Sequence, residues 1–427
     1  MRRFTAVVLV LLAGFVISAA AQNPSPVPVP AETVQVTDPA AATRAWLDTV
    51  PADERARSDA YFEGGYWLLL WNFLLTAAIS IFLLQSRISA RLRDWAERKI
   101  RFKTLQVVLY AIPYLLLASL LAFPLTVYES FLREHAYGMA TQTFGAWFGE
   151  QMMSLLLALI FGSLALMGLY AVFRRAPRTW WLWGTGVVLL FMMVSMLIGP
   201  VYIQPLFNTY RPITDPAIAE PILELARGNN IPVTQVYEVD ASRQTKRISA
   251  NVSGFLGTTR IALNDNLLTQ CTLPEIRHVM GHEMGHYVLN HTRTLLILFG
   301  TFFFISFLVA KLTFGWAVRR WGERWGVRGI ADPAGLPLLI LIFAAVSLML
   351  TPFRNTTTRT SEIDADRFAL SSAREPDAAA MVALKLGTYR KLNPGRLEEF
   401  IFFTHPSGRK RIHMAMQWKA EHQGAKQ

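Results

Sequence analysis

The feature that most constrains the fold of this chain is a series of long apolar blocks that are almost free of charge. A helix needs about 20 apolar residues to cross the roughly 30 Å hydrocarbon core of a bilayer. Such blocks suit a chain that is 52% hydrophobic and only 17% charged. The sequence therefore predicts a polytopic α-helical membrane protein whose partner is the lipid bilayer. The predicted spans are Tyr66–Leu84, Leu105–Val127, Met152–Phe173, Trp180–Val201, Leu295–Phe314 and Leu336–Leu350.

The first 21 residues have the pattern of a secretory signal peptide. A basic start is followed by an apolar run from Ala6 to Ile17 and by three alanines ahead of Gln22. The alternative is a retained first transmembrane helix, which gives six spans plus either a signal peptide or a seventh span. Residues 22–65 form a polar N-terminal segment, and its Pro-rich and Ala-rich part at 23–59 is expected to be loosely ordered.

Polar, periodic stretches late in the chain indicate a discontinuous α+β metallopeptidase domain that a membrane hairpin divides. Helical spacing covers Ala217–Arg227, and short strands are expected at Gln235–Val239 and Arg260–Leu263. We therefore expect a four-helix membrane region at 66–201, a first catalytic part at 202–293, a transmembrane hairpin at 294–352 and a second catalytic part at 353–427.

The sequence His282-Glu283-Met284-Gly285-His286 places two histidines four residues apart. Thr272, followed three residues later by Glu275, has the pattern of a capping box that starts a helix here. On a helix both imidazoles lie on one face, as two ligands of a tetrahedral Zn²⁺ require. Glu283 is offset by one position and is suited to accept a proton from the attacking water. The pattern predicts a zinc metalloendopeptidase; two satisfied surface histidines are the alternative that the motif alone leaves open.

The third metal ligand does not come from the same helix. His291 follows His286 by five residues with no glycine between them, which does not fit the metzincin pattern. Glu362 and Asp366 lie one helical turn apart later in the chain. Glu362 can therefore bind zinc while Asp366 orients a ligand histidine. From spacing alone, an ordinary solvated helix position explains Glu362 equally well.

Four motifs and one shorter echo carry a resemblance to a known family. They are Gly199–Asn208, Gly281–His286 with Asn290-His291-Thr292, Arg359–Asp366, His405-Pro406 with Arg411-Ile412, and the echo Glu134–Gly138. Together they resemble the integral-membrane CAAX prenyl protease type 1 family of zinc metallopeptidases, over the chain from about Tyr61 onward. The resemblance implies membrane helices around a large internal chamber, with the zinc site at one end.

The resemblance also implies roles for individual residues. Glu283 would be the general base, and His405 would help to stabilise the oxyanion of the tetrahedral intermediate. Asn251 aligns with an asparagine that the family places near the bound peptide, and Arg411 would be a structural or substrate-contacting residue near the site. The implied zinc ligands are His282, His286 and Glu362.

Membrane orientation explains the formal net charge of +12, so no nucleic-acid partner is expected. Lysine and arginine concentrate in the loops at 87–103, 174–178 and 311–328, which alternation of the spans puts on one side. The positive-inside rule then predicts an inner or cell membrane protein with its catalytic domain on the non-cytoplasmic side. The alternative is a cytosolic catalytic domain, as in eukaryotic members of the family. The segments opposite the basic loops, outside the catalytic parts, hold only Arg44, Arg55, Arg57 and Arg133.

The predicted orientation, which differs from that of eukaryotic members of the family, favours quality control of membrane or exported proteins over the processing of prenylated CAAX peptides. The substrate is in either case expected to be a peptide or a membrane protein. A catalytically inactive chaperone or scaffold of the same fold is an alternative, although it has no need of Glu283. An intramembrane protease is disfavoured by the charged residues around the histidine motif, and a transporter by the scarcity of ionisable residues in the spans.

Overall fold

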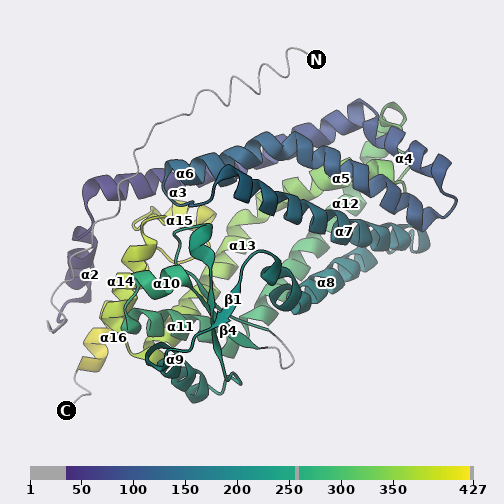
Figure 1. Cartoon of the computed structure of the whole chain (residues 1–427). Coiled ribbons are helices and arrows are strands. Elements are labelled where there is room, and N and C mark those ends of the chain that lie inside the picture. The colour runs from purple at the N-terminus through teal and green to yellow at the C-terminus, as the bar shows by residue number, and fades with distance from the viewer. Residues whose placement is uncertain (1–34, 255–258, 424–427) are drawn as a thin grey trace.

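The computed structural model describes residues 35–254 and 259–423 (Figure 1). The predicted signal peptide or seventh span, at residues 1–21, lies outside the described residues. Six helical segments of the described part are long and apolar enough to cross a membrane, which confirms the six predicted spans. Their main helices are α3 (Ala52–Gln85), α5 (Lys103–Val127), α7 (Phe144–Arg175), α8 (Trp180–Ile198), α12 (His291–Trp325) and α13 (Leu336–Ala373).

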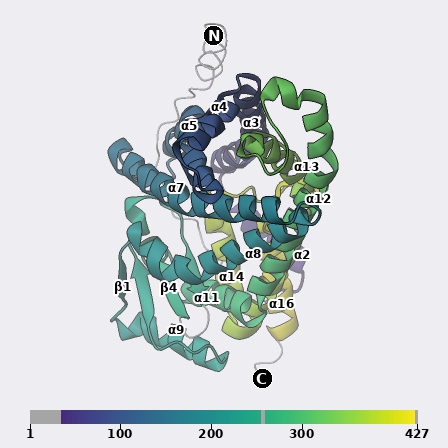
Figure 2. The same ribbon diagram turned by 90° about the vertical axis from the view of Figure 1, so that its right-hand side faces the viewer.

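The six spanning helices form a closed ring. Helix α5 contacts α7, α7 contacts α8, α8 contacts α12, and α12 contacts α13. Helix α13 returns to α3, which contacts α5. Figure 2 shows these membrane helices gathered on one side of the sheet and the C-terminal helices. A ring is the arrangement that the expected internal chamber requires, and the chamber itself stays a prediction.

The first soluble part folds around a four-stranded sheet with the order β1-β2-β4-β3. Strands β2 and β4 are parallel, while β1 and β3 pair antiparallel at the two edges. The two predicted strands are confirmed as β2 (Val236–Val239) and β4 (Arg260–Asn264), and the predicted helix as α9 (Pro216–Gly228). The sequence did not predict β1 (Tyr210–Pro212), β3 (Ala250–Ser253) or α10 (Asp265–Gln270).

The second soluble part consists of helices that follow α13. Helix α14 packs against α16 and against α11, the helix that carries the histidine motif. Helix α15 contacts α13. On the opposite side, buried Ile261 and Leu263 of β4 share an apolar core with Met280 and Met284 of α11. Helix α11 is therefore held between the sheet of the first soluble part and the helices of the second. The bounds are α11 (Leu273–Val288), α14 (Pro376–Leu386), α15 (Arg396–Phe402) and α16 (Gly408–His422).

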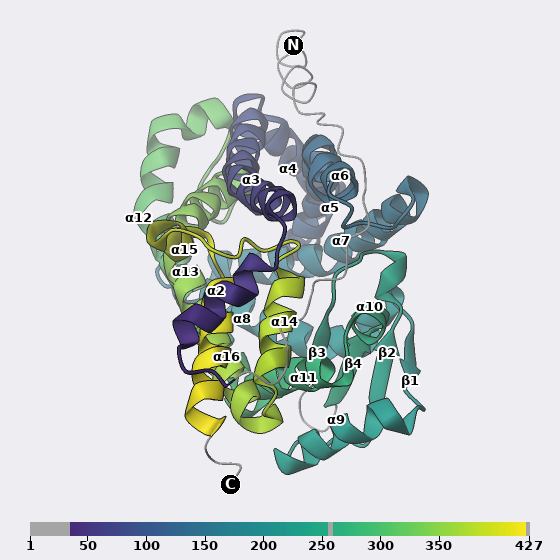
Figure 3. The same cartoon turned by 90° about the vertical axis from the view of Figure 1, so that its left-hand side faces the viewer.

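The N-terminal segment is more ordered than its composition predicts. Helix α2 spans Pro39–Asp48 and α3 begins at Ala52, so the prediction of a loosely ordered segment is wrong for residues 39–59. Trp46 and Leu47 are buried in one apolar core with α14 and α16, and Figure 3 shows α2 beside these helices. The apolar partners that order α2 lie more than 300 residues away, so local composition does not reveal them.

Two of the basic loops are joined at one end of the ring. Helix α4 (Ile88–Lys99) follows α3, and its buried Arg93 pairs with Asp332 in the connection between α12 and α13. Arg328 of that connection pairs with Glu97 at 2.9 Å. Figure 1 shows α4 at the opposite end of the molecule from α16. These two loops therefore lie on one side, as alternation of the spans predicts.

Helix α13 is continuous from the membrane to the catalytic region. Its first half is apolar, and its second half carries the buried Glu362 and Asp366. The boundary expected at residue 353 falls within this helix. One rigid element therefore connects the spanning region directly to the residues predicted to complete the metal site.

Candidate metal centre

Helix α11 starts as predicted, with a capping box. The backbone N–H of Thr272 donates to the carboxylate of Glu275 at 2.6 Å. Glu275 also pairs with Lys385 at 2.7 Å, which fastens this end of α11 to α14. These contacts fix the start of the helix two and a half turns before His282, so the direction in which the two histidines point is set by a well-anchored element.

Two glycines allow α11 to approach α13 closely. A Cβ atom on Gly281 would lie 3.2 Å from the Cα atom of Ala369, and one on Gly285 would lie 3.2 Å from that of Ala365. Side chains at these positions would push the helices apart. Because the helices are this close, Glu362, one turn before Ala365 on α13, reaches the histidines of α11.

Three potential metal-ligand atoms converge at one point. The Nε2 atoms of His282 and His286 lie 3.1 Å apart. The Glu362 carboxylate lies 3.2 Å from Nε2 of His282 and 3.5 Å from Nε2 of His286. A tetrahedral ion with bonds of 2.0–2.1 Å would separate its ligand atoms by about 3.3 Å. Oε2 of Glu362 is buried without a hydrogen-bond partner. The residues therefore fit a metal ion held by two imidazoles and one carboxylate.

The other ring nitrogen of each histidine also has a partner. Nδ1 of His282 lies 2.8 Å from Oδ1 of Asp366. Nδ1 of His286 lies 2.8 Å from Nδ1 of His291. Such contacts fix the ring orientation and leave Nε2 for a metal. The sequence interpretation considered His291 only as a metal ligand; the turn at Asn290, which has a positive φ of 54°, brings it back against His286.

Arg411 of α16 is committed to Asp366. Its Nε donates to Oδ2 of Asp366 at 2.8 Å, and its Nη2 donates to Oδ1. The buried carboxylate is thus bridged between a guanidinium and the imidazole of His282. Burial alone would lower the pKa of His282, but the contacts with Asp366 and Glu362 outweigh it and raise that pKa to about 9. Of the two roles expected for Arg411, structural or substrate-contacting, this arrangement suits the structural one.

Glu283 remains available for proton transfer. It forms no hydrogen bond or ion pair with the residues that the structure describes. Burial raises the pKa of its carboxyl to about 7, and the nearby Glu362 carboxylate acts in the same direction. A carboxylate with a pKa near the working pH can both accept and return a proton.

His405 is brought to the site by the connection between α15 and α16. Its Nε2 lies 3.3 Å from Oε2 of Glu362, and its Nδ1 lies 2.9 Å from the Thr404 hydroxyl. Burial lowers the pKa of His405 to about 3, so the ring is neutral at pH 7. Arg359 of α13 donates to the carbonyls of Glu399 and Phe403 and so holds this connection in place.

Asn251 lies on β3, an edge strand that contacts α11. Its Oδ1 atom is buried without a hydrogen-bond partner. The structure thus brings His282, His286, Glu362, Asp366, His405 and Arg411 together, and puts Asn251 on the strand beside them. The roles predicted for these residues stay predictions at this point.

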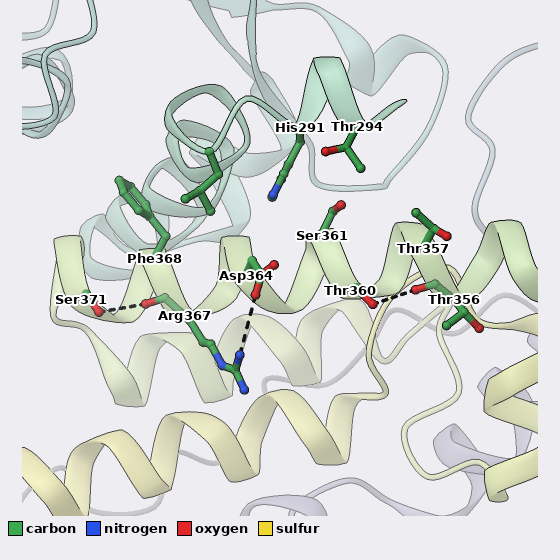
Figure 4. A pocket seen from close by; sticks show the side chains of 11 residues that line it. His291, Thr294, Thr356, Thr357, Thr360, Ser361, Asp364, Arg367, Phe368 and Ser371 are labelled. Carbon is green, nitrogen blue, oxygen red and sulfur yellow. Dashed lines mark hydrogen bonds and ion pairs between the residues drawn. The ribbon is translucent and has the colours of Figure 1, made fainter. Parts of the chain in front are cut away.

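Two cavities border this group of residues. The larger, of about 730 Å³, lies between the start of α12 and the polar face of α13 (Figure 4). Its wall includes His291, Ser361 and the ion pair between Asp364 and Arg367. The smaller, of about 140 Å³, lies on the His405 side, between the ends of α14 and α15 and the start of α16.

The ring of spanning helices and the His-Glu-x-x-His helix facing a glutamate on a second helix define a membrane metallopeptidase. Residues 212–419 match the model of Peptidase family M48, and residues 35–209 match the model described as CAAX prenyl protease N-terminal, five membrane helices. The chain belongs to peptidase family M48. The expected family and its metallopeptidase activity are thereby confirmed.

Individual relatives agree with this assignment. The "Uncharacterized metalloprotease YhfN" of Bacillus subtilis (strain 168) is 31% identical over 347 residues, which cover 80% of this chain and 81% of the relative. CAAX prenyl protease 1 of Saccharomyces cerevisiae is 26% identical over 318 residues, 69% of each chain. The crystal structure of S. mikatae Ste24p has a similar fold, with a TM-score of 0.72 over 88% of this chain and 95% of that chain at 19% identity.

Proposed function

We propose that the protein hydrolyses peptide bonds with a zinc ion held by His282, His286 and Glu362. The observation that carries this proposal is the convergence of two imidazole nitrogens and one carboxylate at mutual distances of 3.1–3.5 Å. Two histidines with one glutamate are a donor set typical of catalytic zinc. When bound, zinc polarises the substrate carbonyl and lowers the pKa of the attacking water towards about 7.

The residues around the metal would carry out the remaining chemical roles: proton transfer, stabilisation of the oxyanion, and orientation of a ligand and of the substrate. Glu283 accepts the proton of the attacking water and passes it to the leaving nitrogen, which its pKa of about 7 supports. His405, if its Nε2 carries the proton, donates to the oxyanion of the tetrahedral intermediate. Asp366 orients His282. The substrate backbone runs beside β3, the edge strand that carries Asn251.

The catalytic unit is proposed to combine residues 202–293 with residues 353–427, brought together by the hairpin at 294–352. The basic loops at the end of the ring opposite to α16 support a catalytic unit on the non-cytoplasmic side of an inner or cell membrane. A substrate reaching the site from that side would be a membrane or exported protein. Quality control of such proteins therefore suits this chain better than processing of prenylated CAAX peptides.

The central test separates metal binding from proton transfer. Glu283→Gln in the full-length protein should retain zinc and lose peptide cleavage, because the ligands survive while the base is lost. Glu362→Ala should lose zinc as well as activity. The matched control is Glu224→Gln, an exposed glutamate of α9. Normal cleavage by Glu283→Gln, or full zinc content in Glu362→Ala, would show that the roles assigned here are wrong.

Sidedness and substrate need separate experiments. A reporter fused after Gln427 that works only outside the cytoplasm should be active, and activity restricted to a cytoplasmic reporter would refute the orientation.

The Glu283→Gln protein, which should bind but not cleave, can be used to retain substrates from membranes for identification by mass spectrometry. Prenylated peptides among them would favour CAAX processing instead.

A further inference from the structure

The smaller cavity beside His405 is lined by cations and by no acidic side chain. Arg390, Lys391 and Arg411 contribute to its wall, and the other lining residues, which include His405, are neutral at pH 7. Arg390 lies in the connection between α14 and α15. Because His405 borders both this cavity and Glu362, the cavity opens next to the metal centre.

Arg390 differs from the other two basic residues of the cavity because no carboxylate of the described residues contacts it directly. Lys391 pairs with Glu398 at 2.9 Å, and Arg411 is bound by Asp366. Arg390 forms no hydrogen bond or ion pair with any residue in the described ranges 35–254 and 259–423. Its guanidinium lies only near the ring of its neighbour Tyr389, 5.9 Å from the ring centroid.

The energetics of this position favour an anion. Burial lowers the pKa of Arg390, and repulsion by the Arg411 guanidinium adds to the effect; together they outweigh the smaller attraction of Glu362 and Asp366, so the cation is destabilised where it stands. A guanidinium with a free face binds a carboxylate through two parallel hydrogen bonds. Nothing in the metal-centre chemistry described above uses Arg390. An arginine kept beside a catalytic site at such a cost is expected to have an anionic ligand.

We propose that Arg390 and this cavity bind a carboxylate group of the substrate and thereby select which peptide bond is cleaved. This inference rests on the proposed peptidase function. A volume of about 140 Å³ is the space of roughly five water molecules, which suits a carboxylate with one or two carbon atoms but not a large side chain.

The position of the cavity limits where this carboxylate lies in the substrate. His405 separates the cavity from the metal centre, and one extended residue spans about 3.3–3.6 Å. Because His405 borders both the cavity and Glu362, the carboxylate belongs to a residue close in the substrate sequence to the bond that is cleaved. It can be the C-terminal carboxylate of a peptide cut near its end, or the side chain of an aspartate or glutamate. Both sources offer the same group to Arg390.

The test measures binding rather than cleavage and uses full-length, zinc-loaded Glu283→Gln protein. Fluorescently labelled short peptides are compared in pairs: a free C-terminus against a C-terminal amide, and an internal glutamate against glutamine. We expect the carboxylate form of one pair to bind about tenfold more tightly, as a charged hydrogen bond provides. Preference within the first pair assigns the C-terminus, and preference within the second assigns an acidic side chain.

Substitution of Arg390 then decides the proposal. Arg390→Gln should remove the preference for the carboxylate peptide and leave the affinity for the neutral peptides unchanged. Arg390→Lys should keep part of the preference, because the positive charge remains but the bidentate hydrogen-bonding geometry is lost. Arg396→Gln, an exposed arginine of α15, should bind as the unsubstituted protein does. The proposal is overturned if the two peptides of each pair bind with equal affinity, or if neither binds. It is also overturned if the preference for the carboxylate peptide survives in Arg390→Gln. Cleavage by the Glu283→Gln protein would refute the catalytic mechanism and leave this binding comparison standing.

Discussion

The close packing of α11 on α13 makes Gly285→Ala the most informative perturbation of the metal centre. The new Cβ atom would lie 3.2 Å from both the Cα of Ala365 and the Cβ of Phe368. Carbon atoms prefer about 3.5–4.0 Å, so the helices must separate by a few tenths of an ångström. Metal sites tolerate shifts of only about 0.2 Å in their bond lengths. Glu362 is carried by α13 and the histidines by α11, so the separation acts directly on the ligand set.

The magnitude follows from two opposing effects. Overpacking costs about 1–3 kcal/mol, whereas alanine in place of glycine returns about 1 kcal/mol of helix propensity. The net loss of folding stability is then about 0–2 kcal/mol. If the full overpacking cost of about 1–3 kcal/mol destabilises the zinc-bound conformation, zinc affinity drops by about 5- to 150-fold. Competition with a chromophoric chelator measures that affinity, and thermal unfolding of the same detergent-solubilised protein measures stability.

A matched control separates this contact from a general effect of alanine in helices. Gly149 lies within α7, and a Cβ atom there would meet nothing within 4 Å. Gly149→Ala should therefore leave zinc affinity unchanged and stability equal or slightly higher. If Gly285→Ala binds zinc and unfolds as the unsubstituted protein does, the close approach of the two helices does not set the ligand geometry, and the reasoning is refuted.

Three further predictions address other contacts. His291→Ala should weaken zinc binding by about 10- to 100-fold, because His286 loses the partner of its Nδ1; unchanged affinity in chelator competition would contradict this. Removing the metal with a chelator should lower the melting temperature and abolish cleavage, and zinc at a hundredfold excess over its Kd should restore about 2.7 kcal/mol of stability; no thermal shift on adding zinc would speak against a bound ion. Trp46→Ala should cost about 3–5 kcal/mol in thermal unfolding, because Trp46 is only 5% exposed; a loss below about 1 kcal/mol would mean that α2 contributes little.

Features that depend on neighbouring residues were predictable from the sequence. The six spans follow from the length of each apolar block, and the start of α11 follows from the capping pattern of Thr272 and Glu275. That His282 and His286 lie on one face of α11 follows from their spacing of four residues on a helix. Each of these depends on contacts within about one or two helical turns, where the residues themselves carry the information.

Features that depend on distant partners were not predictable. The edge strands β1 and β3 are three or four residues long and are defined by pairing with β2 and β4. Helix α2 is ordered by a core on α14 and α16. The contact between His286 and His291 needs the left-handed turn at Asn290, which the sequence does not mark with a glycine. In each case the energy that selects the conformation comes from contacts that a local pattern does not contain.

The predicted third ligand, Glu362, illustrates how the membrane region and the candidate site depend on each other. From sequence spacing, Glu362 was as well explained by an ordinary solvated helix position as by a metal ligand. Only the family resemblance favoured the metal ligand. In the structure Glu362 is buried, one turn before Ala365, at the point where α13 passes the glycines of α11. Helix α13 continues through Pro352 to Glu362, so the position of Glu362 depends in part on how the spanning half of α13 packs on α3 and α12. The ring of membrane helices therefore contributes to the geometry of the predicted metal centre as well as anchoring it, because one helix carries both a membrane span and a predicted ligand.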